Sequence, residues 1–197
     1  MTVFYSIQNL PVAEEIPFEL LHLELVGQIL EKTDAEEREK ALANLELIGF
    51  NAGYRLIEKL TKESPKFKDE LDLMKFICKD FWMSVFRKQI DNLRTNHQGV
   101  YVLQDNSFKF LTKVWLIFPA IYLVTVPLQA SCDRQYLEAS PKFVAFTCGL
   151  VRGSLANLGL FHVIFTFNWW QSGVNTIVTA EVTSMPACKF QVQVQRN

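Results

Sequence analysis

Apolar residues recur with a helical period near the start of the chain, and the first predicted helix is apolar on two sides. Pro17 suits the first position of a helix, where its missing backbone N–H is not needed. One apolar face carries Phe18, Leu21, Leu25 and Ile29, and a second carries Leu20, Leu23 and Leu30. A helix with two apolar sides must be covered twice, and the domain's own core covers only one side unless the helix is central.

A second helix is predicted from Asp34 to about Lys62, because Asp34 can cap it and Glu37 follows at the spacing of a capping box. This helix also has two apolar faces. One holds Leu42, Leu45, Gly49, Ala52 and Leu56, and the other holds Leu47, Phe50, Tyr54 and Ile57. Gly49 and Gly53 each cost about 1 kcal/mol relative to Ala in a helix interior, so we expect another helix to approach closely there.

The surplus apolar area of these two helices predicts a protein partner. The alternative is that both helices are central elements of a monomer. The predicted partner-binding residues are Phe18, Leu21, Leu25, Ile29, Leu42, Leu45, Gly49, Ala52, Gly53 and Leu56.

Two further helices are predicted downstream. Residues 67–86 carry apolar side chains at core spacing, among them Cys78, which we expect to be a small buried side chain rather than a ligand. Residues 136–158 form the fourth predicted helix, which starts or bends at Pro141.

Alternating patterns predict two β-hairpins. Residues 100–104 alternate, and the turn-forming pair Asp105-Asn106 leads to a second predicted strand at 108–110. In SMPACKFQVQVQ, apolar and polar residues alternate again, and we expect this strand to pair with residues 176–182. The order ααα-ββ-α-ββ predicts an α+β fold, with helices packed on one face of a small four-stranded antiparallel sheet.

Length and charge limit the function classes. A chain of 197 residues suits one domain, so we expect a single domain over residues 17–197 after a flexible N-terminal extension, residues 1–16. The 20 Lys and Arg nearly balance the 21 Asp and Glu, which argues against a nucleic-acid partner. Four scattered cysteines and the lack of a signal-peptide pattern predict reduced thiols in the cytosol.

The sequence shows no recognisable catalytic or metal-binding motif. His22, His97 and His162 fall in different elements without metal-ligand spacing, and no nucleotide-binding or esterase motif is found. The polar stretch 88–99 is interpreted as a solvated connector or an interface rim. We therefore predict a non-enzyme with no catalytic residue, no metal and no cofactor.

Long segments resemble the small-subunit family of the TRAPP (transport protein particle) vesicle-tethering complex, and within it the subunit 6 group. The similar runs follow the family's order and cover most of the chain from Phe50 onward. They are FNAGYRLIEKLTKESPKFKDELDLMKFICKDFW, KQIDNLRTNHQGVYVLQDNSFKFL, FTCGLVRGSLANLG and VTAEVTSMPACKFQVQVQ.

The resemblance implies a non-catalytic α+β subunit that pairs through its helices with TRAPP subunit 3. It implies a complex that acts in endoplasmic reticulum to Golgi transport and in guanine-nucleotide exchange on a Rab GTPase, with the exchange surface built chiefly by other subunits. The chain would lie in the cytoplasm, peripheral to membranes through the complex alone. An acyl-modified cysteine of the pairing subunit corresponds to Ser64 here, so acylation is not expected.

Two apolar segments depart from the family pattern as insertions. Residues 114–129 are too few for the roughly 20 of a spanning helix, and Pro119 and Pro127 interrupt them. Residues 160–173 interrupt the family pattern in the same way. We hypothesise that both are translated introns; the alternative is a lineage-specific hydrophobic loop that contacts a membrane or a partner.

Two other function classes remain open from the sequence. One is a stand-alone α+β module that binds an apolar ligand between helices and sheet. The other is a membrane-associated enzyme, which would need a polar constellation that the sequence does not offer.

Overall fold

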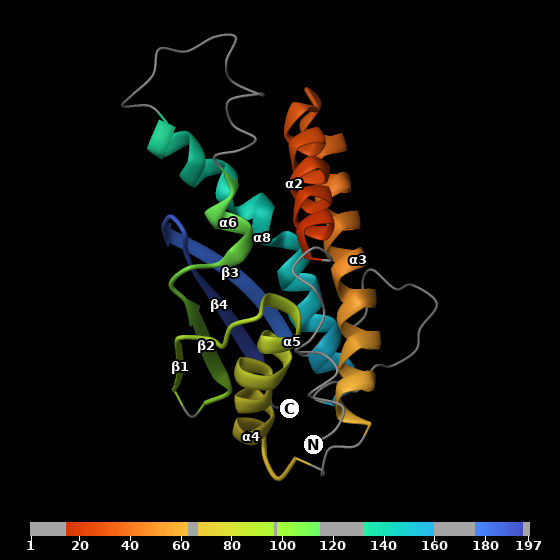
Figure 1. Ribbon diagram of the computed structural model, residues 1–197, viewed down its shortest axis with the longest axis vertical. Coiled ribbons are helices and arrows are strands. Elements are labelled where there is room, and N and C mark those ends of the chain that lie inside the picture. Colours follow the sequence, from red (N-terminus) through yellow and green to blue (C-terminus); the bar gives the residue numbers. More distant parts are fainter. Residues whose placement is uncertain (1–14, 63–66, 97, 115–131, 160–175, 195–197) are drawn as a thin grey trace.

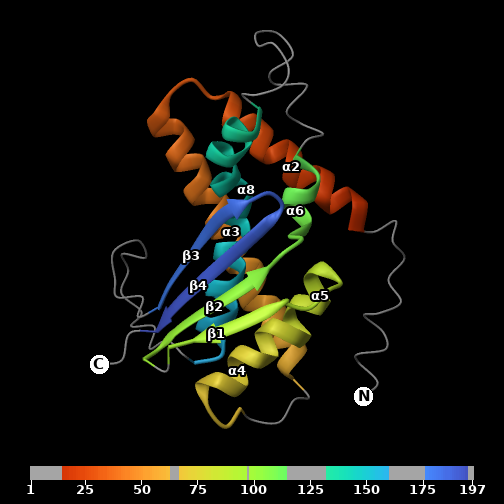
Figure 2. The ribbon, with the colours of Figure 1, turned by 90° about the vertical axis from the view of Figure 1, so that its left-hand side faces the viewer.

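Helices cover one face of a four-stranded antiparallel sheet in the computed structural model, which describes residues 15–62, 67–96, 98–114, 132–159 and 176–194 (Figure 1). The elements are α2 (Glu15–Glu31), α3 (Ala35–Thr61), α4 (Glu70–Phe76), the π-helical turn η2 (Ile77–Phe81), α5 (Trp82–Phe86), β1 (Asn92–Thr95), β2 (Val100–Asp105), α6 (Lys109–Thr112), α8 (Cys132–Asn157), β3 (Thr176–Ser184) and β4 (Ala187–Val194). Figure 2 looks onto the sheet, with α3 and α8 behind it. The predicted α+β fold class is confirmed.

Helix α3 begins where its capping residue predicts. The carboxylate of Asp34 accepts a hydrogen bond from the backbone N–H of Glu36 at 3.0 Å, which satisfies one of the free donors of the first turn. Glu37, the expected partner of a capping box, instead lies 3.6 Å from the ammonium of Lys32. The helix ends at Thr61, so the predicted range is confirmed within one residue.

Four glycines bring α3 and α8 into backbone contact. A Cβ atom on Gly49 would lie 2.0 Å from the carbonyl oxygen of Phe146, and one on Gly53 would lie 2.0 Å from that of Leu150. On α8, a Cβ on Gly149 or Gly153 would lie 1.9 or 2.0 Å from the carbonyl oxygen of Glu46 or Phe50. The close helix approach expected from Gly49 and Gly53 is therefore present, and α8 of the same chain makes it.

The sheet has the strand order β1-β2-β4-β3, and every neighbouring pair is antiparallel. The predicted β3–β4 hairpin is confirmed. In β4, Phe190 and Val192 are fully buried against the helices, while Gln191 and Gln193 are exposed on the other face. The alternation of apolar and polar residues identified the buried face of β4, because successive side chains of a strand point to opposite sides of the sheet.

The first hairpin was predicted with the wrong partner strand. Residues 108–110 do not form a strand: Phe108 precedes the helical turn α6, and Phe108 and Phe110 are both buried. The partner of β2 is β1, which lies inside the predicted connector 88–99 and pairs Leu93 with Leu103. Two aromatic residues at i and i+2 were too short a pattern to separate a strand from a helical turn.

The third predicted helix is present as α4, η2 and α5 in one run, capped by Asp69. The π-helical turn changes the helical phase, and the consecutive residues Phe81 and Trp82 are both fully buried. Cys78 lies in this turn and is also buried, as expected. Its thiol is free, as are those of Cys148 and Cys188.

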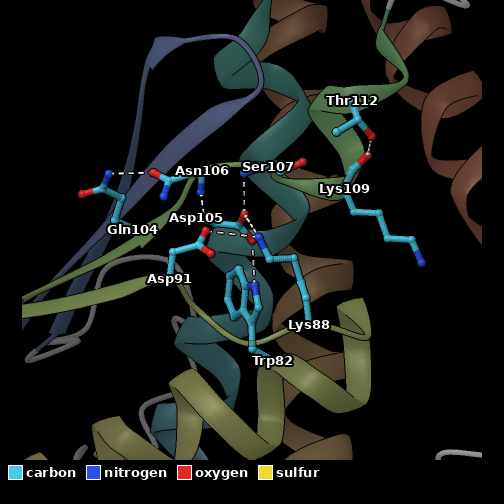
Figure 3. Close-up of polar contacts among 9 residues, drawn as sticks. All are labelled: Trp82, Lys88, Asp91, Gln104, Asp105, Asn106, Ser107, Lys109 and Thr112. Carbon is cyan, nitrogen blue, oxygen red and sulfur yellow. Dashed lines mark hydrogen bonds and ion pairs between the residues drawn. The ribbon is translucent and has the colours of Figure 1, made fainter.

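A buried carboxylate fixes the turn between β2 and α6 (Figure 3). Asp105 is fully buried and accepts hydrogen bonds from Trp82 Nε1 at 3.0 Å, from Lys88 Nζ at 2.5 Å and from the backbone N–H of Ser107 at 3.0 Å. Asp91 accepts from Lys88 Nζ at 3.2 Å and from the N–H of Asn106 at 2.7 Å. This last bond is the largest of the effects that hold the pKa of Asp91 below its usual value, against the opposing desolvation.

Both predicted insertions, 114–129 and 160–173, lie outside the described residues except for Val114, which is buried. Ser64 and residues 1–14 lie outside them too. The expected single domain and the flexible extension stay predictions. None of the helices in the described ranges combines the length and the hydropathy that crossing a bilayer requires.

Adding one methyl group at the glycine contact should destabilise the fold. We expect Gly53→Ala to lower the free energy of unfolding by at least about 2 kcal/mol, because its Cβ would meet backbone atoms that cannot move aside alone. Urea unfolding measures the change. Asn51→Ala, an exposed change on the same helix, should stay within about 0.5 kcal/mol. Equal effects of the two variants would contradict the contact.

Removing the buried carboxylate should have a large effect on stability. Asp105→Ala leaves the indole N–H of Trp82 and the ammonium of Lys88 without their shared acceptor, so we expect a loss of about 3 kcal/mol in unfolding free energy. Thermal and urea unfolding check this. Glu36→Ala breaks only an exposed ion pair with Lys40, and its loss should stay within about 1 kcal/mol.

Candidate partner-binding surface

Helix α2 exposes large apolar side chains. Leu21 is 57 % exposed, and Phe18 and Leu25 lie on the same side of the helix at 43 % and 39 %. Ile16 and Leu20 are exposed as well. An exposed single apolar residue needs no explanation, but five on one helix indicate a surface that another molecule covers.

Helix α3 adds further exposed apolar residues. Ile48 is 56 % exposed, Tyr54 is 42 % exposed, and Ala52 is also exposed. Gly49 and Gly53 pack against α8, and Ile48, Ala52 and Tyr54 flank that contact with their side chains exposed. Helix α8 contacts both α2 and α3, and in Figure 2 the two helices diverge on either side of it.

The ten predicted partner-binding residues divide by exposure. Exposed are Phe18, Leu21, Leu25 and Ala52; half-buried are Leu42 and Leu56; buried within the chain are Ile29, Leu45, Gly49 and Gly53. The buried four pack inside the chain, so they support the surface rather than form it. As a partner-binding set, the exposed residues stay a prediction.

Four further exposed residues of α2 and α3 are not among the predicted partner-binding residues: Ile16, Leu20, Ile48 and Tyr54. Ile48 and Ala52 are four residues apart, and this spacing could have assigned Ile48 to an outer stripe of α3. Leu20 and Tyr54 had been placed on a second apolar face of each helix. Which of two apolar faces is buried depends on packing against α8, and a helical period does not contain that information.

Aromatic rings hold the first half of α2 to the body. The ring centroid of Phe18 lies 5.9 Å from that of Phe110 and 5.6 Å from that of Phe146. The imidazole of His22 stacks on Phe110 with a centroid distance of 4.0 Å. These contacts link α2 to both α6 and α8.

A buried carboxylate joins α2 to α6. Glu19 Oε1 lies 2.7 Å from Lys109 Nζ, and its Oε2 accepts a hydrogen bond from Lys113 Nζ. Desolvation is the largest single effect on the pKa of Glu19 and raises it. The hydrogen bonds and charges of Lys109 and Lys113 outweigh it, so the pKa of Glu19 lies below its usual value.

The imidazole of His22 is buried in this contact without a polar partner. Only 2 % of the residue is exposed, and neither ring nitrogen has a hydrogen-bond partner among the residues that the structure describes. Desolvation lowers its pKa to about 4, so the ring is neutral at physiological pH. A buried donor left unsatisfied costs about 1–3 kcal/mol.

Comparison with known proteins places the chain. Residues 18–195 match the family model described as transport protein particle (TRAPP) component. The chain belongs to the TRAPP family. It is 51 % identical over 186 residues to trafficking protein particle complex subunit 6b of Danio rerio, covering 94 % of this chain and 99 % of that protein. It is 50 % identical over 187 residues to subunit 6B of Homo sapiens, with the same coverage.

A solved structure agrees with the TRAPP assignment at the level of the fold. Trafficking protein particle complex subunit 3 from Naegleria fowleri, covalently bound to palmitic acid, superimposes with a TM-score of 0.59 over 94 % of this chain and 98 % of that one. Sequence identity is 16 %, so the likeness shows the fold alone. The resemblance to the TRAPP family and its subunit 6 group is confirmed.

The described part of this TRAPP chain offers neither clustered metal ligands nor, at Cys78, Cys148 and Cys188, a reactive thiol. It contains no group of three or more His, Cys, Asp or Glu arranged to hold a metal ion. Burial raises the pKa of the Cys78 and Cys148 thiols to about 12 and raises that of Cys188 further, so these thiols are protonated at neutral pH. A hollow on the open sheet face is lined by Arg94, Glu181 and other polar residues.

His22 should make stability depend on pH. The unfolded chain binds a proton at this residue below about pH 6.5, while the folded chain resists it down to about pH 4. Stability is therefore lost as pH falls through this window, by up to about 3 kcal/mol from this residue. We expect His22→Leu to remove that loss in urea unfolding measured between pH 7 and pH 4.5.

Carboxylates such as Glu19 titrate both in the unsubstituted chain and in His22→Leu. The difference in pH dependence between these two proteins therefore reports the imidazole alone. Gln28→Leu, an exposed change on α2, should keep the pH dependence of the unsubstituted chain. An equal slope in His22→Leu would contradict the assignment.

Proposed function

We propose that this TRAPP-family chain is a non-catalytic subunit of a TRAPP vesicle-tethering complex and pairs with TRAPP subunit 3 through the exposed apolar residues of α2 and α3. The observation that carries the proposal is the side of α2 formed by Phe18, Leu21 and Leu25, which the chain leaves exposed. The names of the Danio rerio and Homo sapiens relatives, both trafficking protein particle complex subunits, support the assembly.

The energy of such pairing comes from apolar burial. Fully burying a side chain such as Leu21 contributes about 1.5–3 kcal/mol relative to leaving it exposed. Ile48 and Tyr54 on α3 offer comparable area. A few well-packed anchors of this kind supply most of the binding energy of a protein interface.

Within the complex, the chain would support endoplasmic reticulum to Golgi transport and guanine-nucleotide exchange on a Rab GTPase as a scaffold. Its link to the Rab GTPase would be indirect, and its contact with membranes would be peripheral and made through the complex. The balanced charge of the sequence offers no basis for a nucleic-acid partner.

The alternative is a stand-alone module that holds an apolar ligand between helices and sheet. In the described part of the chain this space is filled by large side chains. Fully buried there are Phe81, Trp82, Phe108, Phe143 and Phe190. Trp82, Phe108 and Phe190 contact one another with ring centroids 5.3–6.2 Å apart, so the core is packed by the chain itself.

A single charge on the exposed side of α2 should disrupt pairing. We expect Leu21→Asp to raise the Kd for purified TRAPP subunit 3 at least about tenfold, because the carboxylate would be buried without a partner. Titration calorimetry measures the affinity, and size-exclusion chromatography shows the heterodimer.

Ile177→Asp is the matched control. Ile177 is 46 % exposed on β3, away from α2, so the same chemical change there should leave the affinity unchanged. Equal unfolding temperatures for both variants show that the fold persists. If Leu21→Asp still pairs with the affinity of the unsubstituted chain, α2 is not the interface.

A further inference from the structure

Helix α2 buries two polar side chains while it leaves large apolar ones exposed. It buries Glu19 and His22, at 4 % and 2 % exposure, and leaves Phe18, Leu21 and Leu25 exposed. Burying large apolar residues and exposing polar ones is the usual outcome, so this orientation needs a specific cause.

Apolar packing alone does not select the orientation. The inner side of α2 also carries Leu23 and Val26, both buried, so the helix offers apolar residues to the core in more than one rotational setting. Adjacent residues of a helix point about 100° apart. Turning α2 about its axis by roughly that angle would bring the side with Leu21 and Leu25 toward the core. Because the hydrophobic effect is non-directional and both sides carry apolar residues, apolar burial does not by itself fix one rotational setting.

His22 works against the observed setting. Its two ring nitrogens have no hydrogen-bond partner among the described residues, and rotation of the helix toward solvent would hydrate them. The stacking on Phe110 offsets part of this penalty. The ring contacts of Phe18 with Phe110 and Phe146 favour the observed setting, but Phe18 keeps 43 % exposure, so a more directional contact on the inner side of α2 is needed to fix it.

Glu19 provides that contact. Each carboxylate oxygen takes one lysine of the neighbouring segment: Oε1 lies 2.7 Å from Lys109 Nζ, and Oε2 accepts from Lys113 Nζ. The carboxylate side chain is 6 % exposed, while the lysines are 24 % and 37 % exposed. A buried carboxylate that pairs with two donors is directional, and turning α2 by about 100° would separate it from both lysines.

We propose that Glu19 is a positioning residue: its paired contacts with Lys109 and Lys113 fix the rotation of α2 about its axis and thereby determine that Leu21 and Leu25 face outward, with Phe18 at the edge of the same side. A single buried polar residue fixes register in coiled coils in the same way. The consequence for pairing rests on the proposed function. The rotation itself is a property of the chain alone.

Thiol labelling can measure the rotation in the full chain. Leu21→Cys reports the outer side, at 57 % exposure, and Leu23→Cys reports the inner side, at 3 %. Residues 1–32 contain no native cysteine, and Lys32 is the first lysine or arginine of the chain, so with Glu19 present trypsin releases the reporter cysteine in a peptide that ends at Lys32. With Glu19 present, we expect the outer cysteine to label at least about tenfold faster than the inner one.

Glu19→Lys should reverse this order, because a third ammonium in the site would face Lys109 and Lys113 and rotation would carry it to solvent. Adding Lys109→Glu and Lys113→Glu to this variant should restore the original order. Glu24→Lys, the same change at an exposed position of α2, should leave the order unchanged. In Glu19→Lys the reporter lies in residues 20–32, and in Glu24→Lys it lies in a peptide that ends at residue 24, so each labelled peptide still holds a single cysteine. Circular dichroism and the unfolding temperature show that each variant folds.

Either of two results would overturn the proposal: an unchanged order in Glu19→Lys, or equal rates at both positions, which would mean that α2 has left the body. If Glu19→Lys does not fold, Glu19→Gln replaces it, and the ratio of the two rates should fall at least about threefold. A ratio that stays constant in Glu19→Gln would refute the role equally.

The two proposals fail separately. If Leu21→Asp abolishes pairing with TRAPP subunit 3 but Glu19 variants keep the labelling order, the interface stands and the positioning role is wrong. If the labelling order reverses but Leu21→Asp pairs normally, Glu19 sets the rotation and the proposed partner surface is wrong. Agreement of both is expected, with Glu19→Lys raising the Kd for subunit 3 at least about tenfold.

Discussion

The backbone contact between α3 and α8 is the constraint on which the remaining architecture depends. Four glycines leave no room for a side chain there, since a Cβ atom at any of them would lie about 2 Å from a carbonyl oxygen of the other helix. Helix α8 also packs against β3 on its other side. The two helices and the sheet therefore share one core, and the sides of α2 and α3 turned away from α8 are the ones that remain exposed.

Two buried carboxylates fix features that apolar packing does not determine: the path of the chain after β2 and the rotation of α2. Asp105 holds the turn after β2 against Trp82 and Lys88, so the chain enters α6 with Phe108 and Phe110 in the core. Glu19 then uses two lysines in and after α6 to hold α2. Buried ion pairs are weak evidence for stability but specify geometry, because an unpaired buried charge is unfavourable in every alternative arrangement.

The packed core and the exposed apolar residues are consistent with a subunit of an assembly such as TRAPP. The described core is filled by aromatic side chains, its thiols are buried and protonated, and most of its exposed large apolar residues lie on α2 and α3. An assembly role uses such a surface directly, because association contributes the apolar burial that the chain itself leaves incomplete. Helix α3 is held in backbone contact with α8 at four glycines, and α2 is held by Glu19, so the surface is largely formed before binding and the ordering entropy lost on binding is limited.

The sequence by itself determined the local elements. Asp34 marked the start of α3, alternation assigned the buried face of β4, and Gly49 and Gly53 indicated a close helix contact, because each of these signals depends on neighbours within a few residues. Only the tertiary structure decided which helix meets the glycines, which strand pairs with β2, and which side of α2 faces the core. These choices depend on contacts between residues far apart in the chain, such as Glu19 with Lys109, and a periodic pattern cannot encode them.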